Sequence, residues 1–561
     1  MKAKDGVRFL CAAALLAACT ADAGVVATRS MSLPEPFDRT VELAQVVELP
    51  DIAAVVWRDC DSQDSPWECG AIEVPLDYRR PDDLSSVSIA VTRLPATVPS
   101  ARIGSLVLNP GGPGGSGLDL AWGYAARFPA EVLERFDLVG FDPRGVGRST
   151  AVDCGDLERS FRVVERDCIA RSGALLPYVG TSNAARDVEQ LRKALGDEQL
   201  TYIGFSYGTA LGAVYANLFP ASVRALVLDG SVDPAAGEYN VNGSSSGSTD
   251  SPFYGVQDFG GTLEVFLSLC DAVRDCTAGP RSGELLDELY GDVDDADIEY
   301  FDGWDDTVTA GQVDGIIASA MYNTELWALL AVALADGAGG DASTLAALGS
   351  FLEAGYPREE NAADNLTEAN LAVYCADFAG RRGPLTVERC RGWPETAEPL
   401  PPITAVDVAN PIVVIGTDGD PATPGFLAPE MAAALGDAVS VRWEGAGHTA
   451  FLQSACVDQI VTDYLIDLEV PANRTRCGFT DGQNTTVARA QQVFRLDRQR
   501  FEARLATVFI AEGSSLMQAA CLAAALAEQA DDSVLVYARL GVQHPDYLEL
   551  RERLERECAT G

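Results

Sequence analysis

Apolar residues recur along this chain in two patterns, short continuous runs and helically spaced positions. The short runs are typical of buried strands, and they occupy residues 88–94, 105–109, 136–141, 200–204 and 225–229. Residues 183–195 instead place Ala184, Val188, Leu191 and Leu195 on one face of a predicted helix. Because strands and helices alternate, the pattern predicts an α/β fold whose mostly parallel sheet is covered by helices on both faces.

This alternation is interrupted in the middle of the chain. A polar, Gly- and Ser-rich segment begins near residue 231, and helical spacing then dominates, as in residues 311–334. Strand-like runs return at 411–416 and 439–443, which indicates a helical lid inserted into the core. We therefore expect a leader (1–18), a tether (19–45), the first part of the core (46–230), the lid insertion (231–400), the second part of the core (401–477) and a helical C-terminal extension (478–561).

The first residues have the pattern of an export signal. Basic residues within the first eight positions precede an apolar stretch, 9–18, which is too short to span a bilayer. Residues 16–19, Leu-Ala-Ala-Cys, also resemble a bacterial lipobox, in which Cys19 becomes lipid-modified. The alternative is an ordinary cleavage site with an incidental cysteine. We expect an exported bacterial protein, either secreted or a cell-envelope lipoprotein whose only membrane attachment is a lipid on Cys19.

Cysteine spacing agrees with export. Of the 14 cysteines, Cys11 and Cys19 lie in the leader region, and the others form sequence-local couples. Such couples predict neighbour-to-neighbour disulfides formed in an oxidising compartment. Zinc binding is the alternative, but the chain has no C-x-x-C pair and only 2 histidines. The predicted pairs are Cys60 with Cys69, Cys154 with Cys168, Cys270 with Cys276, Cys375 with Cys390, Cys456 with Cys477, and Cys521 with Cys558.

The charge balance limits the classes of partner. The chain has 41 basic and 83 acidic residues and a formal net charge of −42. Nucleic-acid binders need basic patches that displace counterions, so we expect no nucleic-acid partner. The acidity is interpreted as a solvated surface, with attraction of cationic substrates such as peptide amino termini as the alternative.

One serine lies in a pattern associated with catalysis. Residues 204–208, Gly-Phe-Ser-Tyr-Gly, end the strand-like run at 200–204 and match the nucleophile elbow G-x-S-x-G around Ser206. A nucleophilic serine needs a base. His448 lies in a glycine-flanked loop after the run at 439–443, where this fold presents its base, whereas His544 lies in the helical tail and is interpreted as structural.

An acidic residue between Ser206 and His448 completes the expected order. Asp420 follows the strand-like run at 411–416, and the order Ser, Asp, His is that of α/β-hydrolases. Asp418 is the second choice and is more typical of a turn, and Asp229 is a weaker alternative.

A glycine-rich loop follows the run at 105–109 and offers donors for an oxyanion. Glycines leave backbone amides uncovered, so we assign one donor to the amide of Gly112, with Gly111 next, and the other to the amide of Tyr207. The same loop also fits the dinucleotide pattern G-x-G-x-x-G. Pro113 and the second Gly-Gly pair make a poor helix start, and an exported protein rarely meets NAD. We therefore expect no cofactor and no metal.

Several of these motifs together resemble a known family. The block at 187–234, the loop NPGGPGGSG, and the segments FDPRGVGRS, YCADF, DGDPATP and GAGHT are similar to those of the secreted tripeptidyl-aminopeptidase-like α/β-hydrolases, relatives of proline iminopeptidases with a TAP-like C-terminal region. The resemblance runs from about Cys60 to Cys477. It implies the α/β-hydrolase fold, a triad of Ser206, Asp420 and His448, and an exopeptidase that acts on free N-termini.

The functional hypothesis is an exported serine exopeptidase that releases short peptides, such as tripeptides, or single residues through an acyl-enzyme. A carboxylesterase on the same fold is the alternative, and a non-catalytic surface-binding lipoprotein is disfavoured by the complete triad order. An aminopeptidase needs a carboxylate for the substrate amine, which we expect from the lid. Asp377 is the first choice, although a helix cap or a core-edge acid is an equal alternative, and Glu325 is the second.

Overall fold

The computed structural model describes most of the chain after the tether. The predicted leader, Cys19 and the tether lie outside the described residues. No helix in the described part is both long and apolar enough to cross a membrane. The described residues are 49–60, 66–80, 83, 85–155, 161–233, 259–274, 276–295, 298–299, 307–354, 365–378, 390, 392–396, 398, 400–479, 494, 505–506, 509, 516–540, 542 and 544–558.

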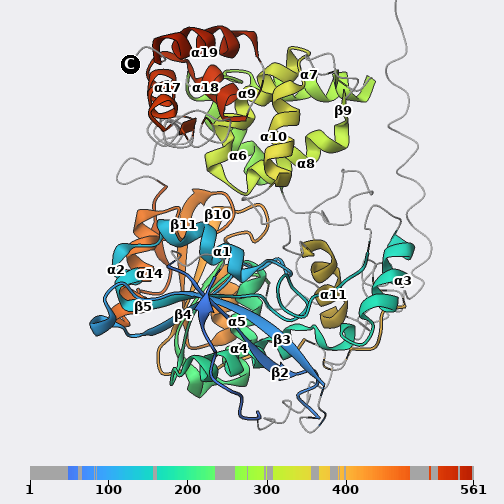
Figure 1. The fold of residues 1–561 in the computed structure, drawn as a ribbon, viewed down its shortest axis with the longest axis vertical. Helices are drawn as coiled ribbons and strands as arrows, with labels where there is room; N and C mark the ends of the chain where they lie inside the picture. Colours follow the sequence, from blue (N-terminus) through green and yellow to red (C-terminus); the bar gives the residue numbers. More distant parts are fainter. Residues whose placement is uncertain are drawn as a thin grey trace, which may run out of the picture. The chain divides into compact units, whose positions relative to one another are not determined.

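A central sheet, ten-stranded within these residues, organises the core in the order β1-β2-β3-β5-β4-β6-β7-β10-β11-β12 (Figure 1). Neighbours pair in parallel from β5 to β12, and the first three strands are antiparallel. The strands are β1 (Arg58–Asp59), β2 (Glu68–Pro75), β3 (Ser86–Leu94), β4 (Gly104–Asn109), β5 (Phe136–Phe141), β6 (Leu200–Phe205), β7 (Val223–Asp229), β10 (Ile412–Gly419), β11 (Ala438–Ala446) and β12 (Thr475–Cys477).

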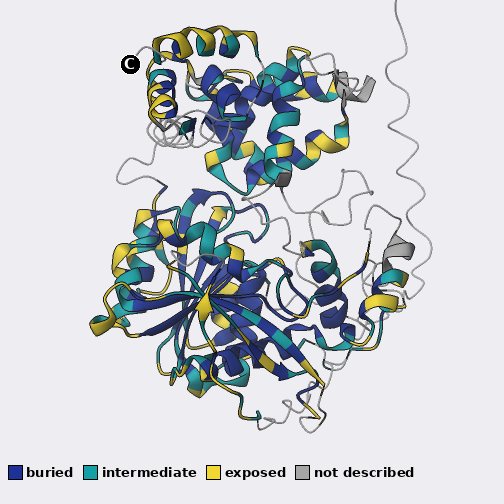
Figure 2. Ribbon diagram, in the orientation of Figure 1, coloured by how far each residue is buried: buried dark blue, intermediate teal, exposed yellow. Residues whose placement is uncertain are grey.

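Helices bury the central strands on both faces, which explains why these strands read as continuous apolar runs. In β4, Val107 faces one hydrophobic cluster and Leu106 and Leu108 face the other. Figure 2 shows the resulting buried centre. One cluster includes α4 (Thr181–Leu195), α5 (Tyr207–Leu218) and α13 (Leu427–Leu435), and the other includes α1 (Gly117–Tyr124), α2 (Ala130–Arg135) and α14 (Ala455–Asp467).

The predicted elements of the core are confirmed with small shifts at their ends. Residues 136–141 form β5, and the helix predicted at 183–195 is α4. Helix α3 (Phe161–Ser172) follows β5 in the chain. Its Cys168 is bonded to Cys154, which ties α3 to the loop that follows β5.

The helices of the insertion share a hydrophobic core with the C-terminal extension. Phe266 packs edge-on against Trp327 and Phe494, with ring centroids 5.4 and 5.7 Å apart, and the Tyr537 hydroxyl donates to Asp336 Oδ1 at 3.2 Å. The elements are α6 (Phe259–Asp271), α7 (Ser282–Asp295), β8 (Ile298–Glu299), β9 (Thr307–Val308), α8 (Ala310–Met321), η5 (Thr324–Leu326), α9 (Trp327–Ala338), α10 (Ser343–Ala354), α17 (Leu516–Gln529), α18 (Asp532–Leu540) and α19 (Pro545–Cys558).

Helix α11 (Leu366–Phe378) lies within the predicted insertion but packs elsewhere. Its buried side chains, from Ala372 to Phe378, join the hydrophobic cluster that contains α4 and α5. The Asn370 amide also donates to the carbonyl of Pro113 at 2.9 Å. The insertion is therefore divided between the lid core and the α/β core.

All six predicted disulfides are present, which confirms the neighbour-to-neighbour pairing and agrees with an oxidising compartment. The loops that they close range from 6 residues for Cys270–Cys276 to 37 for Cys521–Cys558. The Cys456–Cys477 bond joins α14 to β12, and the Cys521–Cys558 bond joins α17 to α19.

We expect non-reducing peptide mapping of the purified protein to recover these six pairs and no others. The local loops favour this result because each cysteine's partner is its nearest cysteine in the chain. A free thiol at any of the twelve positions, or a bridge between couples, would contradict the pairing. Mapping after reduction provides the control.

Candidate active site

Ser206 occupies a sharp turn between β6 and α5. Its backbone has φ 55° and ψ −124°, in the left-handed region that side chains rarely adopt. The turn needs glycine on both sides, because a Cβ on Gly204 would lie 2.3 Å from the carbonyl oxygen of Gly208. The Ser206 amide donates to the carbonyl of Asp229 at 2.9 Å. This is the strand–turn–helix that the G-x-S-x-G motif predicts.

His448 and Asp420 lie together on the loops that follow β11 and β10. The imidazole Nδ1 is 2.9 Å from Oδ1 and 3.0 Å from Oδ2 of Asp420. The Asp420 side chain is fully buried and accepts backbone N–H groups from Ala422, Thr423 and Thr449 at 2.8–3.0 Å. These donors fix the carboxylate, which in turn orients the imidazole.

This pairing controls the pKa of His448. Burial alone lowers the pKa of the imidazole, but the charge of Asp420 and its hydrogen bond outweigh burial, and Asp229 adds to their effect. The pKa of His448 is therefore raised above its ordinary value of 6.5. A histidine in this state accepts a proton readily.

The two other predicted carboxylates contact different groups. Asp229 accepts the amides of Ala450 at 3.0 Å and Phe451 at 2.7 Å, and its burial raises its pKa to about 6. Asp418 instead pairs with Arg442. Among the described residues, only Asp420 of the three bonds to the imidazole.

Asp229 nevertheless connects the serine with the histidine. Its carbonyl accepts the Ser206 amide, and the next residue, Gly230, lies against His448. A Cβ on Gly230 would lie 3.5 Å from Cε1 of the imidazole. The ends of β6, β7, β10 and β11 therefore gather the predicted triad residues in one place.

The glycine-rich loop lies directly against the elbow. Gly111 and Gly112 have φ 91° and 110°, and a Cβ on Gly111 would lie 2.9 Å from Ser206 Cβ and 3.0 Å from the Tyr207 nitrogen. The Gly111 amide already donates to Asn109 Oδ1 at 3.1 Å. No hydrogen bond from the Gly112 amide occurs among the described residues, so this placement favours Gly112 over Gly111 as an oxyanion donor. Tyr207 follows the nucleophile and begins α5, which is the position whose amide lines the oxyanion hole in this fold.

The loop is not arranged for a dinucleotide. Asp142, which such a site would use for a ribose, is fully buried, and its carboxylate accepts the Ser116 hydroxyl at 2.6 Å and the Arg148 amide at 2.8 Å. The hydrogen bonds of Asp142 therefore connect the start of α1 to the turn after β5.

Asp377 lies beneath the site. Its side chain is fully buried at the start of α4, where it accepts the Thr181 amide at 2.8 Å and the Thr181 hydroxyl at 2.5 Å. The same hydroxyl contacts the phenol of Tyr207 at 2.6 Å. This placement favours the helix-cap interpretation of Asp377 over amine binding, because solvent and substrate do not reach the carboxylate.

Glu325 lies on the lid side, in η5. It is about one-third exposed and pairs with Arg127 of the core at 3.5 Å. The preceding lid residue Tyr322 accepts the backbone amide of His448 at 2.8 Å. A Cβ on Gly447 would also lie 3.6 Å from Thr324 Cγ2, so this part of the lid rests on the His448 loop.

Two residues of the site are not identified by sequence motifs for catalysis. The Tyr322 ring lies edge-on to the imidazole, with centroids 5.1 Å apart and an interplanar angle of 86°. The Thr423 hydroxyl donates to Asp420 Oδ2 at 3.0 Å. Thr423 lies in the DGDPATP segment, which offered a signal, whereas nothing near Tyr322 in the sequence marks it.

His544 has the structural role that the sequence suggests. It stacks on Tyr537 with centroids 4.2 Å apart, and its Nδ1 accepts the Asp546 amide at 3.3 Å at the start of α19. It therefore belongs to the packing of the C-terminal helices.

A serine on a nucleophile elbow, beside a histidine that bonds to a buried aspartate at the carboxyl ends of a parallel sheet, defines a serine hydrolase of the α/β-hydrolase class. The family description "alpha/beta hydrolase fold" matches residues 104–253, and "TAP-like protein" matches residues 376–477.

Curated relatives lead to the same class. The chain is 30% identical over 489 residues to serine protease Hip1 of Mycobacterium tuberculosis. The matched region covers 75% of this chain and 91% of Hip1. It is 28% identical over 495 residues to the tripeptidyl aminopeptidase of Streptomyces lividans, covering 76% and 87% of the two chains. It is 31% identical over 473 residues to carboxylesterase B of Mycobacterium tuberculosis, and the matched region covers 73% of this chain and 86% of that relative. The chain belongs to the tripeptidyl-aminopeptidase-like α/β-hydrolase family.

Proposed function

We propose that this protein is an exported serine exopeptidase that releases short peptides or single residues from free N-termini. The observation that carries the proposal is the His448–Asp420 pair beside the Ser206 elbow, with the lid segment that carries Glu325 in contact with the His448 loop. The names of two relatives, a serine protease and a tripeptidyl aminopeptidase, also favour peptide substrates. The predicted leader and the six disulfides support export.

The proposed chemistry is acyl transfer through the serine. Ser206 Oγ attacks the carbonyl carbon while His448 Nε2 takes the hydroxyl proton, and Asp420 holds the imidazole in the required orientation. The amides of Gly112 and Tyr207 stabilise the oxyanion. His448 then gives its proton to the leaving amine, and water hydrolyses the acyl-enzyme by the same route, which regenerates the Ser206 hydroxyl.

A free amino terminus needs a carboxylate near this chemistry, and we propose Glu325. Its neighbours in the chain touch the His448 loop, and its partial exposure leaves the carboxylate open to a ligand. The substrate ammonium would take the place of Arg127, whose guanidinium also donates to the Leu452 carbonyl at 3.2 Å. Arg127 thus keeps a partner when Glu325 binds the substrate.

The decisive experiment compares three substrates of the purified protein. These are tripeptide anilides with free N-termini, the same anilides with acetylated N-termini, and short acyl esters. We expect kcat/KM to be highest for the free tripeptide anilides, because only they offer the charged amine. Equal rates for free and acetylated anilides would overturn the exopeptidase proposal.

Carboxylesterase activity is the second candidate, and one observation favours it. A relative with 31% identity is named carboxylesterase B, and the same site would cleave esters without any change in its groups. In the substrate comparison, rapid cleavage of acyl esters with little cleavage of any anilide would identify this activity.

We expect Glu325→Gln to raise KM for free N-terminal substrates by about tenfold, the effect of losing one charge-assisted hydrogen bond. The KM for acetylated substrates should stay unchanged, because they carry no ammonium. Glu284→Gln is the matched control, since Glu284 is also a lid glutamate paired with an arginine, Arg281, at 2.7 Å. An equal change in KM for both substrate types would remove Glu325 from amine recognition.

A further inference from the structure

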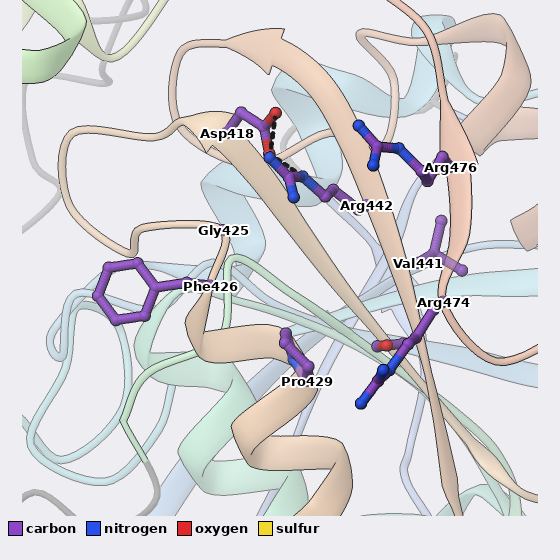
Figure 3. A pocket seen from close by; sticks show the side chains of 9 residues that line it. Asp418, Gly425, Phe426, Pro429, Val441, Arg442, Arg474 and Arg476 are labelled. Carbon is purple, nitrogen blue, oxygen red and sulfur yellow. Dashed lines mark hydrogen bonds and ion pairs between the residues drawn. The ribbon is translucent and has the colours of Figure 1, made fainter.

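A pocket lies at the edge of the sheet, where β11 pairs with β12. It has a volume of about 480 Å³, within the range of small-molecule sites. Its walls come from the ends of β10 and α13, from β11, and from the segment that enters β12 (Figure 3). It is lined by Asp418, Gly425, Phe426, Pro429, Ser440, Val441, Arg442, Arg474 and Arg476, none of which belongs to the predicted triad.

Strand pairing brings the three arginines of this pocket together. In the parallel register of β11 and β12, Arg442 lies opposite Arg476, and Arg474 precedes β12 by one residue. The Arg474 amide donates to the Ser440 carbonyl at 2.7 Å, which fixes the entry to the strand. Figure 3 shows all three arginine side chains around the pocket, Arg442 on β11 and the other two at the start of β12.

The charges of the pocket are not balanced. Arg442 pairs with Asp418, and Arg476 pairs with Glu444, which is not among the lining residues. Arg474 is exposed and has no acidic partner among the described residues. A lining with three guanidinium groups and one carboxylate is cationic, on a protein whose formal net charge is −42.

The backbone of Arg474 gives a second reason to regard the site as specialised. Its φ of 66° places a long side chain in the left-handed region, which the chain adopts only where the surroundings hold it. Such positions occur preferentially at ligand sites. Here the conformation occurs at a residue that lines the pocket and has no acidic partner among the described residues.

The rim of the pocket is apolar. Phe426 is 61% exposed, and it is the one aromatic residue among the exposed large hydrophobic side chains of the described part. Pro429 is also exposed and adds further apolar surface, whereas Val441 is buried in the core. Leu427 begins α13 directly after Phe426, so the positive end of the helix dipole also lies in this wall.

We propose that this pocket binds a small organic anion, one in which a carboxylate or phosphate group is attached to an apolar ring. The planar guanidinium groups match the geometry of either oxyanion, and Arg474 supplies donors that no acid in the described part of the chain engages. The exposed ring of Phe426 and the neighbouring Pro429 contact the apolar part. The neutral analogue of such a ligand lacks the group that the arginines recognise.

The test is isothermal titration of the folded protein at constant ionic strength. The probes are phenyl phosphate, benzoate, inorganic phosphate and the neutral benzyl alcohol, with the candidate serine blocked by a sulfonyl fluoride in a parallel set. We expect one saturable site for phenyl phosphate or benzoate in both sets. The probe that binds with the higher affinity identifies the preferred oxyanion. Absence of saturable binding, or binding of benzyl alcohol with the same affinity, overturns the proposal.

Variants assign the site to the pocket. Arg474→Gln should weaken binding by at least about tenfold, and Phe426→Ala should weaken phenyl phosphate but not inorganic phosphate. Arg166→Gln is the matched control, because Arg166 is a 70% exposed arginine of α3, far from β12 in the sequence. This variant should bind the probes with the affinity of wild type. Unchanged affinity in Arg474→Gln, or equal loss in both arginine variants, overturns the proposal. If Arg474→Gln lacks the thermal transition of wild type, Arg474→Lys replaces it with the same expected direction.

These outcomes are independent of hydrolysis. The titration measures anion binding to protein whose serine is blocked. The binding result is therefore the same whether the enzyme cleaves esters or peptides. Conversely, an active exopeptidase that binds none of the anions overturns only the pocket.

Discussion

Ser206→Ala will lower kcat for peptide anilides by roughly 10³-fold or more, with KM close to that of wild type. The serine hydroxyl forms the covalent bond to the acyl group, so its removal stops the reaction without removing the lid and the oxyanion amides that bind the substrate. Steady-state kinetics on tripeptide anilides measures the effect. A fluorophosphonate probe should label wild type and leave Ser206→Ala unlabelled.

The chain contains its own control for this experiment. His448→Ala should cause a comparable loss, because no described residue other than His448 offers an imidazole at the elbow. His544→Ala should be nearly silent, since His544 packs on Tyr537 among the C-terminal helices. Full activity in Ser206→Ala, or equal losses in the two histidine variants, would refute the mechanism. Circular dichroism of each variant reports whether the fold is retained.

The parts of the site that sequence motifs specify are those set by local backbone chemistry. Gly204 and Gly208 leave no room for a side chain at the turn, so G-x-S-x-G predicts the geometry of Ser206 directly. Gly111 and Gly112 likewise mark a loop with positive φ values. The apolar runs predict the strands because both faces of β4 and β6 are buried.

Other features depend on contacts between distant segments, which a single sequence does not encode locally. The sequence leaves amine binding and helix capping equally open for Asp377, and the contacts with Thr181, at the start of α4, favour the cap. The packing of Phe266 on Phe494 joins the insertion to the extension across more than two hundred residues of chain. Tyr322 reaches the imidazole only because the lid folds back onto the His448 loop.

The basic pocket, in the second part of the core, also depends on contacts between segments that are separate in the sequence. Arg474 and Arg476 have the two-residue spacing of one strand face, but nothing in the sequence groups Arg442 with them. They become neighbours because β11 and β12 pair in parallel and Ser440 holds the entry to β12. Charge clusters of this kind follow from register, which the motifs do not specify.

The second large effect that we expect is a loss in kcat of about 10³- to 10⁴-fold for Asp420→Asn, with a changed pH profile. The amide of asparagine donates where the carboxylate accepts, so it favours the wrong tautomer of His448. The charge of Asp420 also raises the pKa of His448 against the opposing effect of burial. Without that charge, burial lowers the pKa, and the acidic limb of kcat/KM should move to lower pH.

Asp229→Asn is the matched control for this variant, because Asp229 is an equally buried carboxylate beside the same histidine loop. Its side chain holds the amides of Ala450 and Phe451 and does not bond to the imidazole, and an asparagine oxygen still accepts from them. We therefore expect a much smaller loss in kcat and only a slight shift of the acidic limb. The charge of Asp229 raises the pKa of His448 less than that of Asp420 does, so the direction of the shift is the same. If Asp229→Asn lost more activity than Asp420→Asn, or moved the limb further, the acid of the triad would have to be reassigned to Asp229.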